Sequence, residues 1–118
     1  MIKQKNMINY DNKVFIPVSN SENGEVDSGM QFLYRQKENI LTSTYSGGRI
    51  RSGHLIAIVD ENGGLDMRYH QINDRGEIMT GFCKSTPEIM ENGKIRLYEK
   101  WQWTSGDFSE GNSVLEEK

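Results

Sequence analysis

Turn signals recur at short intervals along the whole chain, and this feature most constrains the fold. Asn-Gly, Gly-Gly or related turn-forming pairs occur at 23–24, 38–39, 47–48, 62–64, 75–76 and 92–93, followed by a looser stretch at 106–111. Asn and Gly tolerate the positive φ that a tight hairpin turn requires, so Asn-Gly between alternating segments is a strong hairpin signal. The segments between these turns have the length of ordinary strands. The spacing therefore predicts a succession of β-hairpins.

The composition agrees with a β-protein. Ala57 is the only alanine, whereas the chain of 118 residues contains 12 glycines. Alanine is the best helix former, and its near-absence excludes an all-helical bundle and disfavours a doubly wound α/β fold. The length suits one domain. We predict a mobile N-terminal arm at residues 1–9 and a single domain at residues 10–118.

Alternation of apolar and polar residues between the turns predicts eight strands. They are expected at residues 13–20, 29–36, 40–46, 49–60, 65–73, 77–86, 94–104 and 112–117. Sequential antiparallel strands leave two open edges, and closing the sheet removes both. We therefore predict an all-β fold, an antiparallel up-and-down meander of about eight strands closed into a small barrel. The alternative is an open, strongly curved sheet. Pro87 cannot donate to a sheet ladder, so a bulge or wide loop is expected there.

The alternation also predicts which side chains face the barrel interior, although for residues 65–73 it leaves open which of the two faces points inward. The apolar walls of the interior are expected to include the following polar and aromatic residues: Tyr34, Tyr69, Gln71, Thr80, Glu99, Trp101 and Trp103. In one interpretation, the aromatic rings line a cavity for a small, partly apolar ligand, and Gln71 and Glu99 are its polar anchors. In the other, the barrel is filled by its own side chains, and Glu99 reaches water at a rim or bonds a tyrosine hydroxyl. Cavity volume discriminates between them, since an interior below roughly 100 Å³ cannot hold a drug-sized ligand.

The remaining reactive side chains give weaker signals. Arg68 and His70 share the other face of their strand, where they could bind an anion or act as acid and base, but we expect them at the surface. His54 is expected to be a buried structural histidine. The chain has one cysteine and neither a His-x-His nor a Glu-x-x-His pattern, so we expect no disulfide, no metal site and no cofactor.

Partners follow from charge and hydropathy. The net charge of −3 argues against a nucleic-acid partner. The sequence shows no signal-peptide core and no apolar run near the roughly 18 residues that cross a bilayer, so we expect a soluble cytoplasmic protein without a membrane partner. Within the strand predicted at 49–60, both faces are apolar from Leu55 to Val59. We expect the N-terminal segment or another subunit to cover this strand, the latter giving a homo-oligomer.

Three segments carry a family resemblance: residues 11–18 (DNKVFIPV), 67–71 (MRYHQ) and 100–106 (KWQWTSG). Together they resemble a family of small bacterial proteins, some of which carry the label N-acetylglutamate synthase, and the resemblance spans the chain from about Met7. The label implies an enzyme acting on a carboxylate substrate, for which Arg68, His70 or Glu99 would be candidates. The chain lacks the Gln/Arg-x-x-Gly-x-Gly/Ala loop that cradles the pyrophosphate of acetyl-coenzyme A.

The predicted architecture is also similar in shape to avidin- and lipocalin-type barrels, a similarity that does not by itself transfer a function. The sequence thus favours a non-catalytic barrel that binds a small, partly apolar molecule, with an enzyme acting on a carboxylate substrate as the alternative.

Overall fold

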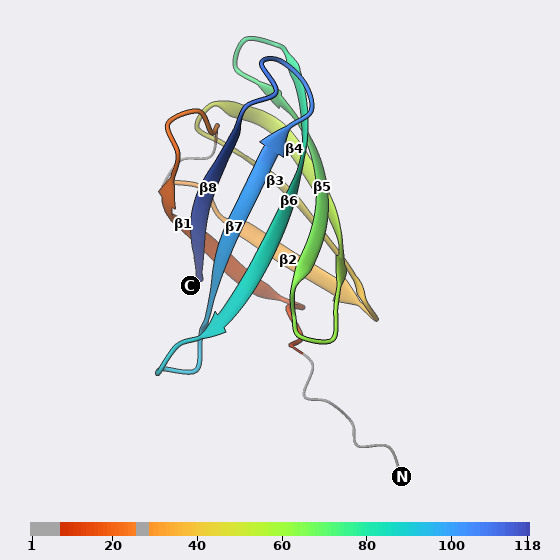
Figure 1. The fold of residues 1–118 in the computed structure, drawn as a ribbon, viewed down its shortest axis with the longest axis vertical. Helices are drawn as coiled ribbons and strands as arrows, with labels where there is room; N and C mark the ends of the chain where they lie inside the picture. Colours follow the sequence, from red (N-terminus) through yellow and green to blue (C-terminus); the bar gives the residue numbers. More distant parts are fainter. Residues whose placement is uncertain (1–7, 26–28) are drawn as a thin grey trace.

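The computed structural model describes residues 8–25 and 29–118, and it is an eight-stranded antiparallel barrel. Successive strands pair in chain order, and β1 pairs with β8 to close the ring (Figure 1). The strands are β1 (Lys13–Asn20), β2 (Phe32–Lys37), β3 (Ile40–Gly47), β4 (Ile50–Val59), β5 (Leu65–Asn73), β6 (Ile78–Ile89), β7 (Ile95–Trp103) and β8 (Glu110–Glu117). The predicted fold is confirmed, and the open-sheet alternative is wrong.

Pro87 lies within β6 and forms neither the bulge nor the wide loop expected from the sequence. The pairing of β6 with β7 runs through Pro87↔Leu97 without a shift in register. On the other side of β6, pairing with β5 ends at Leu65↔Ser85. Proline is tolerated here because this part of β6 has a partner strand on one side only.

Inward positions around the barrel combine large and small side chains. One continuous row of cross-strand partners runs from β3 to β8 and contains Leu41, Ala57, Met67, Cys83, Trp101 and Gly111. The single alanine thus lies opposite a methionine, and a glycine lies opposite a tryptophan. Such mixing fills a narrow barrel without overlap. Thr80 was expected inside but lies on the outer face, because the inward positions next to it belong to Met79 and Gly81.

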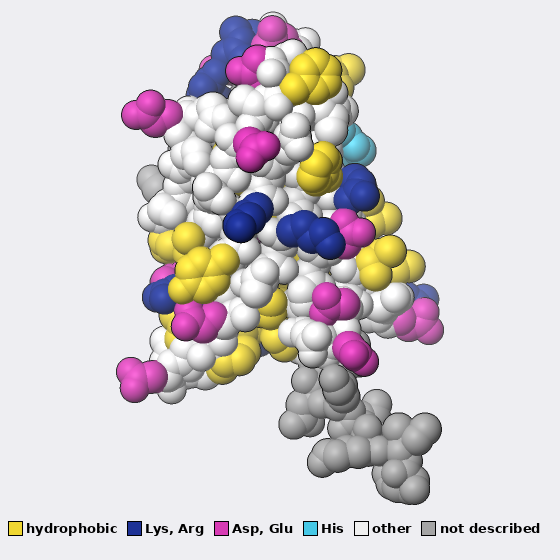
Figure 2. Space-filling model, viewed as in Figure 1, with side chains coloured by type: hydrophobic (Ala, Val, Ile, Leu, Met, Phe, Trp, Pro, Cys, Tyr) yellow, Lys and Arg dark blue, Asp and Glu magenta, His cyan; other side chains and the backbone are white. Residues whose placement is uncertain are grey.

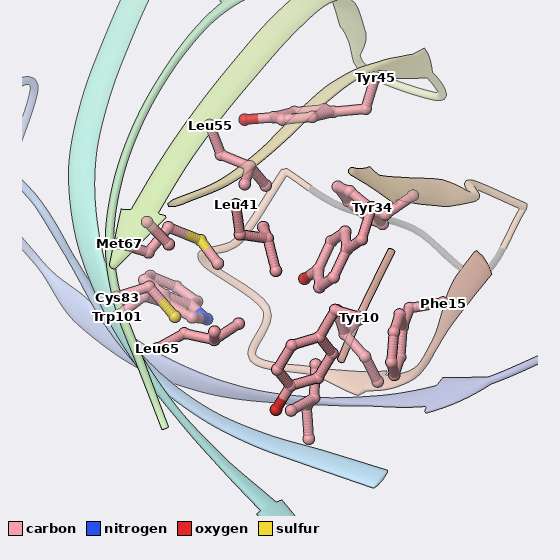
Figure 3. Close-up of a cluster of buried hydrophobic side chains, with 14 of the residues drawn as sticks. Tyr10, Phe15, Tyr34, Leu41, Tyr45, Leu55, Leu65, Met67, Cys83 and Trp101 are labelled. Carbon is pink, nitrogen blue, oxygen red and sulfur yellow. The ribbon is translucent and has the colours of Figure 1, made fainter. Parts of the chain in front are cut away.

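Aromatic rings form a buried cluster where the chain enters β1, and Figure 3 shows Tyr10, Phe15 and Tyr34 close together in it. Tyr10 precedes β1 and is fully buried, and its ring packs against Phe15 and Tyr34 at centroid distances of 5.9 and 6.1 Å. The Tyr10 hydroxyl donates to the Gly63 carbonyl at 2.5 Å, which ties this cluster to the β4–β5 turn. Of the predicted arm at residues 1–9, residues 1–7 lie outside the described part of the chain.

One end of the barrel is crossed by residues 21–25, which we call the mouth segment. Its Asn23 side chain donates to Ser109 Oγ at 2.9 Å and to the Glu110 carbonyl at 3.0 Å. Two residues later, Glu25 accepts hydrogen bonds from β5, the strand opposite β1 in the ring. The mouth segment therefore spans the barrel opening from the β8 side to β5.

The outer surface carries mixed charges. On the face drawn in Figure 2, basic and acidic side chains are interspersed, and hydrophobic side chains occur in small groups. Within the described residues we found no helix with the length and apolar character needed to cross a membrane.

Candidate functional site in the barrel interior

A cavity of about 70 Å³ lies inside the barrel beneath the mouth segment. Its described lining residues are Asn20, Gly24, Glu25, Phe32, Tyr34, Tyr45, Leu55, Met67, Tyr69, Gln71, Cys83, Glu99, Trp101, Trp103, Ser113 and Leu115. All six residues predicted for a ligand site are among them. The structure therefore brings these six side chains together around one space, and their role in binding a ligand stays a prediction.

Three aromatic rings of the cavity wall each lie over a glycine on the neighbouring strand. A methyl group at Gly111 would lie 2.5 Å from the Trp101 ring, its cross-strand partner. The rings of Tyr45 and Tyr69 cover Gly53 and Gly81 in the same way. A side chain at any of these glycines would push the ring toward the barrel axis, so the glycines keep the cavity open.

Glu99 is a buried carboxylate in the wall of this cavity. It is only 9% exposed, and the cross-strand serines on either side bond to it: Ser85 Oγ donates to Oε2 at 2.9 Å, and Ser113 Oγ donates to Oε1 at 3.0 Å. Burial raises the pKa of Glu99, and the two serine hydrogen bonds act against this rise. The sequence interpretation expected Glu99 either to reach water at a rim or to bond a tyrosine hydroxyl, and the structure shows neither. Glu99 is buried, and serines rather than a tyrosine supply its hydrogen bonds.

Tyr34 brings an unpaired hydroxyl to the same space. Its side chain is fully buried, and its hydroxyl has no hydrogen-bond partner among the described residues. The ring packs against Phe15 at a centroid distance of 4.9 Å, and Figure 3 shows the hydroxyl directed toward the barrel interior. Buried hydroxyls are normally hydrogen-bonded, so an unpaired one in a cavity wall marks a place where a bound molecule could supply the partner.

A polar network lies nearer the mouth. Glu25 accepts hydrogen bonds from Gln71 Nε2 at 2.8 Å and from Asn73 Nδ2 at 2.9 Å, and Arg75 Nη2 lies 3.8 Å from the same carboxylate. Gln71 Oε1 in turn accepts from the Tyr45 hydroxyl at 2.9 Å. Gln71 is thus held by a partner on each side, and these bonds attach the mouth segment to the wall of the cavity.

One known protein family matches the chain over the whole of the described barrel. A family model described as avidin-like protein matches residues 8–118. The chain belongs to the avidin-like protein family. No curated protein and no solved structure matches it. Nothing in these comparisons supports the label N-acetylglutamate synthase that the sequence resemblance implied. For this avidin-like barrel, the family match is consistent with a ligand held inside the barrel.

The secondary candidates Arg68 and His70 lie on the outer face, where we expected them. Arg68 forms a 2.7 Å ion pair with Asp66, and its guanidinium carbon lies 5.7 Å from the centroid of the Phe82 ring. His70 is exposed, and its ring centroid is 5.4 Å from that of His54 on the neighbouring strand. Neither residue meets Glu99, because that side chain points into the barrel.

His54 is not the buried histidine that we expected. It is half-buried on the outer face, because the inward positions of β4 fall on Gly53 and Leu55. The described residues contain no group of three or more His, Cys, Asp or Glu side chains that could hold a metal ion.

Sequence reasoning missed several residues of the site. Tyr45 and Ser113 follow the period-two alternation of their strands, so the alternation could have found both. Glu25 could not have been found in this way, since it lies in the loop between β1 and β2 and its place depends on where the mouth segment crosses the barrel.

Proposed function

We propose that this avidin-like barrel is a non-catalytic binding protein whose cavity holds one small molecule. The observation that carries the proposal is that Tyr34, whose buried hydroxyl has no hydrogen-bond partner among the described residues, is one of the residues that line the cavity. Leaving a buried hydroxyl unpaired costs about 1–3 kcal/mol. A ligand that bonds to it would remove this cost.

The cavity volume limits the size of the ligand. At about 70 Å³, the cavity is far smaller than the sites of roughly 300–1,000 Å³ that hold drug-sized molecules. One water needs about 10–15 Å³ of such space, so the cavity has room for roughly five non-hydrogen atoms. This excludes a drug-sized ligand in the observed conformation. The proposed ligand is a compact molecule, or a larger one whose head group fills the cavity while the rest extends out through the mouth of the barrel.

The proposal is tested by native mass spectrometry of protein purified gently, combined with an NMR screen of compact fragments. We expect fragments of about five non-hydrogen atoms, with dissociation constants in the millimolar range, to shift the indole N–H resonances of Trp101 and Trp103. A barrel that retains no ligand and whose indole resonances respond to no fragment would overturn the proposal.

The geometry does not support the alternative function, an enzyme acting on a carboxylate substrate. The groups proposed for such chemistry lie on opposite faces of the wall, with Arg68 and His70 outside and Glu99 inside. An acid–base pair must reach one substrate within hydrogen-bond distance, which this arrangement does not provide.

A further inference from the structure

We propose that the cavity is selective for a small organic cation, a compact ammonium group held by Glu99, Tyr34 and the surrounding aromatic rings. This inference rests on the proposed function and adds the chemical class of the ligand. It follows from the charge of the cavity wall, from the unpaired hydroxyl and from the aromatic surface.

The first step concerns Glu99, a carboxylate without a cationic partner. Its two described hydrogen bonds both come from neutral serine hydroxyls, and none of the ion pairs found among residues 8–25 and 29–118 includes it. An ionised carboxylate accepts about four hydrogen bonds, so two serines leave room for a further donor. A buried carboxylate is stable when a cation or strong donors pair with it. A cationic ligand would supply that pairing.

The second step concerns the other groups that face the cavity. None of its described lining residues is Lys, Arg or His, whereas two of them, Glu25 and Glu99, are carboxylates. Glu25 is already compensated by two amide donors and by Arg75. An anionic ligand would therefore meet two carboxyl groups and no basic side chain, while a cation would meet its complement.

The third step concerns the aromatic wall and Tyr34. The rings of Tyr69 and Trp103 lie 5.7 Å apart, and those of Trp101 and Trp103 lie 5.8 Å apart, both edge to face. Aromatic walls attract organic cations through the negative faces of the rings. The unpaired Tyr34 hydroxyl adds an oxygen that accepts an ammonium N–H, so a compact ammonium satisfies both unfilled polar groups of the cavity.

The test compares two probes of the same size and shape that differ in charge. The tert-butylammonium ion and tert-butanol have the same number of non-hydrogen atoms, and both are small enough for the cavity. We expect tert-butylammonium to bind at least about tenfold more tightly than tert-butanol, because a hydrogen bond to a charged partner is stronger than a neutral one. Titrations followed by ¹H–¹⁵N NMR give both dissociation constants, with the Trp101 and Trp103 indole resonances locating the site.

Variants assign the preference to Glu99. In Glu99→Gln, the ratio of the two dissociation constants is expected to fall to about one, while Glu91→Gln, the same change in an exposed turn, should keep the wild-type ratio. If Glu99→Gln does not give a dispersed spectrum, Tyr34→Phe replaces it. We expect Tyr34→Phe to weaken tert-butylammonium binding by about threefold or more.

Each outcome decides the proposal. Equal binding of the two probes, or tighter binding of tert-butanol, would show that the cavity takes ligands without selecting a cation; it would overturn this inference and leave the proposed function standing. No binding of tert-butylammonium would also overturn it, and the fragment screen would then decide the proposed function separately. A cation preference that survives in Glu99→Gln would place the selectivity elsewhere and contradict the assignment. Where Glu99→Gln does not fold, unchanged tert-butylammonium binding in Tyr34→Phe would contradict it.

Discussion

At the scale of single residues, two tyrosines in one cavity wall have opposite hydrogen-bonding states. The Tyr45 hydroxyl donates to Gln71 Oε1 at 2.9 Å, whereas the Tyr34 hydroxyl has no partner among the described residues. A buried hydroxyl that is paired stabilises the fold, and an unpaired one costs free energy. Tyr34 therefore bears on ligand binding, and Tyr45 bears on the stability of the empty barrel.

The two tyrosine-to-phenylalanine changes form a matched pair. Tyr45→Phe is expected to lower the free energy of unfolding by about 1–2 kcal/mol, because Gln71 loses a donor. Tyr34→Phe should leave it unchanged or raise it by up to about 1 kcal/mol. Urea unfolding of the ligand-free protein measures both. An equal loss in the two variants would mean that the Tyr34 hydroxyl has a partner, such as a buried water.

Glu99 should make stability depend on pH. Burial raises its pKa in the folded protein, so the folded state holds the proton more tightly than the unfolded state does. The stabilisation from this group is therefore fully present below the ordinary glutamate pKa and is lost as pH rises through the raised value. Other groups titrate as well, so the contribution of Glu99 is read from a comparison with a variant.

We expect Glu99→Gln to gain stability relative to the wild type on going from about pH 4 to about pH 7.5, since glutamine stays neutral throughout. Urea unfolding at the two pH values measures this difference, with Glu91→Gln as the exposed control. A difference between Glu99→Gln and the wild type that does not change with pH would contradict the raised pKa.

At the scale of strands, the cavity depends on glycines placed opposite aromatic residues. Gly53 on β4, Gly81 on β6 and Gly111 on β8 each leave space for a ring from a neighbouring strand. In the sequence, Gly111 looks like part of a glycine-rich turn, and the strand is expected to begin only at residue 112. The structure starts β8 at Glu110, which makes Gly111 a strand position facing Trp101.

Gly111→Ala tests this role. The added methyl group would overlap the Trp101 ring, and we expect a loss of about 1–3 kcal/mol in the free energy of unfolding, together with a changed near-UV circular dichroism spectrum. Asn112→Ala, at the neighbouring exposed position, is the control and should leave the tryptophan signal unchanged. An unaltered spectrum in Gly111→Ala would show that the ring does not need the glycine.

At the scale of the whole molecule, the outer face of β3 and β4 is unusually apolar. Ile56 and Ile58 on β4 are 47% and 56% exposed, and Ile40 on β3 is the cross-strand partner of Ile58. The sequence predicts a covered strand here because both faces are apolar. The apolar residues on the inner face of β4 belong to the barrel core. That a second copy of the chain covers the apolar outer face stays a proposal.

We expect the protein to self-associate through this face. Ile58→Lys should shift it toward the monomer, because a lysine disfavours apolar burial, while Val18→Lys, at an exposed position on β1, should leave the association unchanged. Sedimentation equilibrium over a range of concentrations measures both. A wild-type protein that is monomeric at about 100 µM would contradict the prediction, because a stable interface has a dissociation constant well below that concentration.

The sequence by itself determined the barrel and most of the inward side chains. Regular turns set the strand number, and period-two alternation placed Tyr34, Tyr69, Gln71, Glu99, Trp101 and Trp103 inside. Alternation failed where neighbouring positions do not separate clearly by polarity. For that reason Thr80 was expected inside and His54 was expected buried. Pro87 was expected to interrupt β6 for a different reason, its missing N–H donor, and this expectation failed because β5 does not pair with that part of the strand.

Only the tertiary structure decided what those inward residues do to one another. Whether Glu99 meets serines or tyrosines depends on the register between β6, β7 and β8, which alternation within one strand does not define. Whether a cavity remains depends on ring orientations over glycines in other strands, and Glu25 joins the site because the mouth segment crosses the opening. Local sequence thus determines the direction of most side chains in the strands. Their partners, their charge environment and the free volume around them arise from contacts between distant parts of the chain.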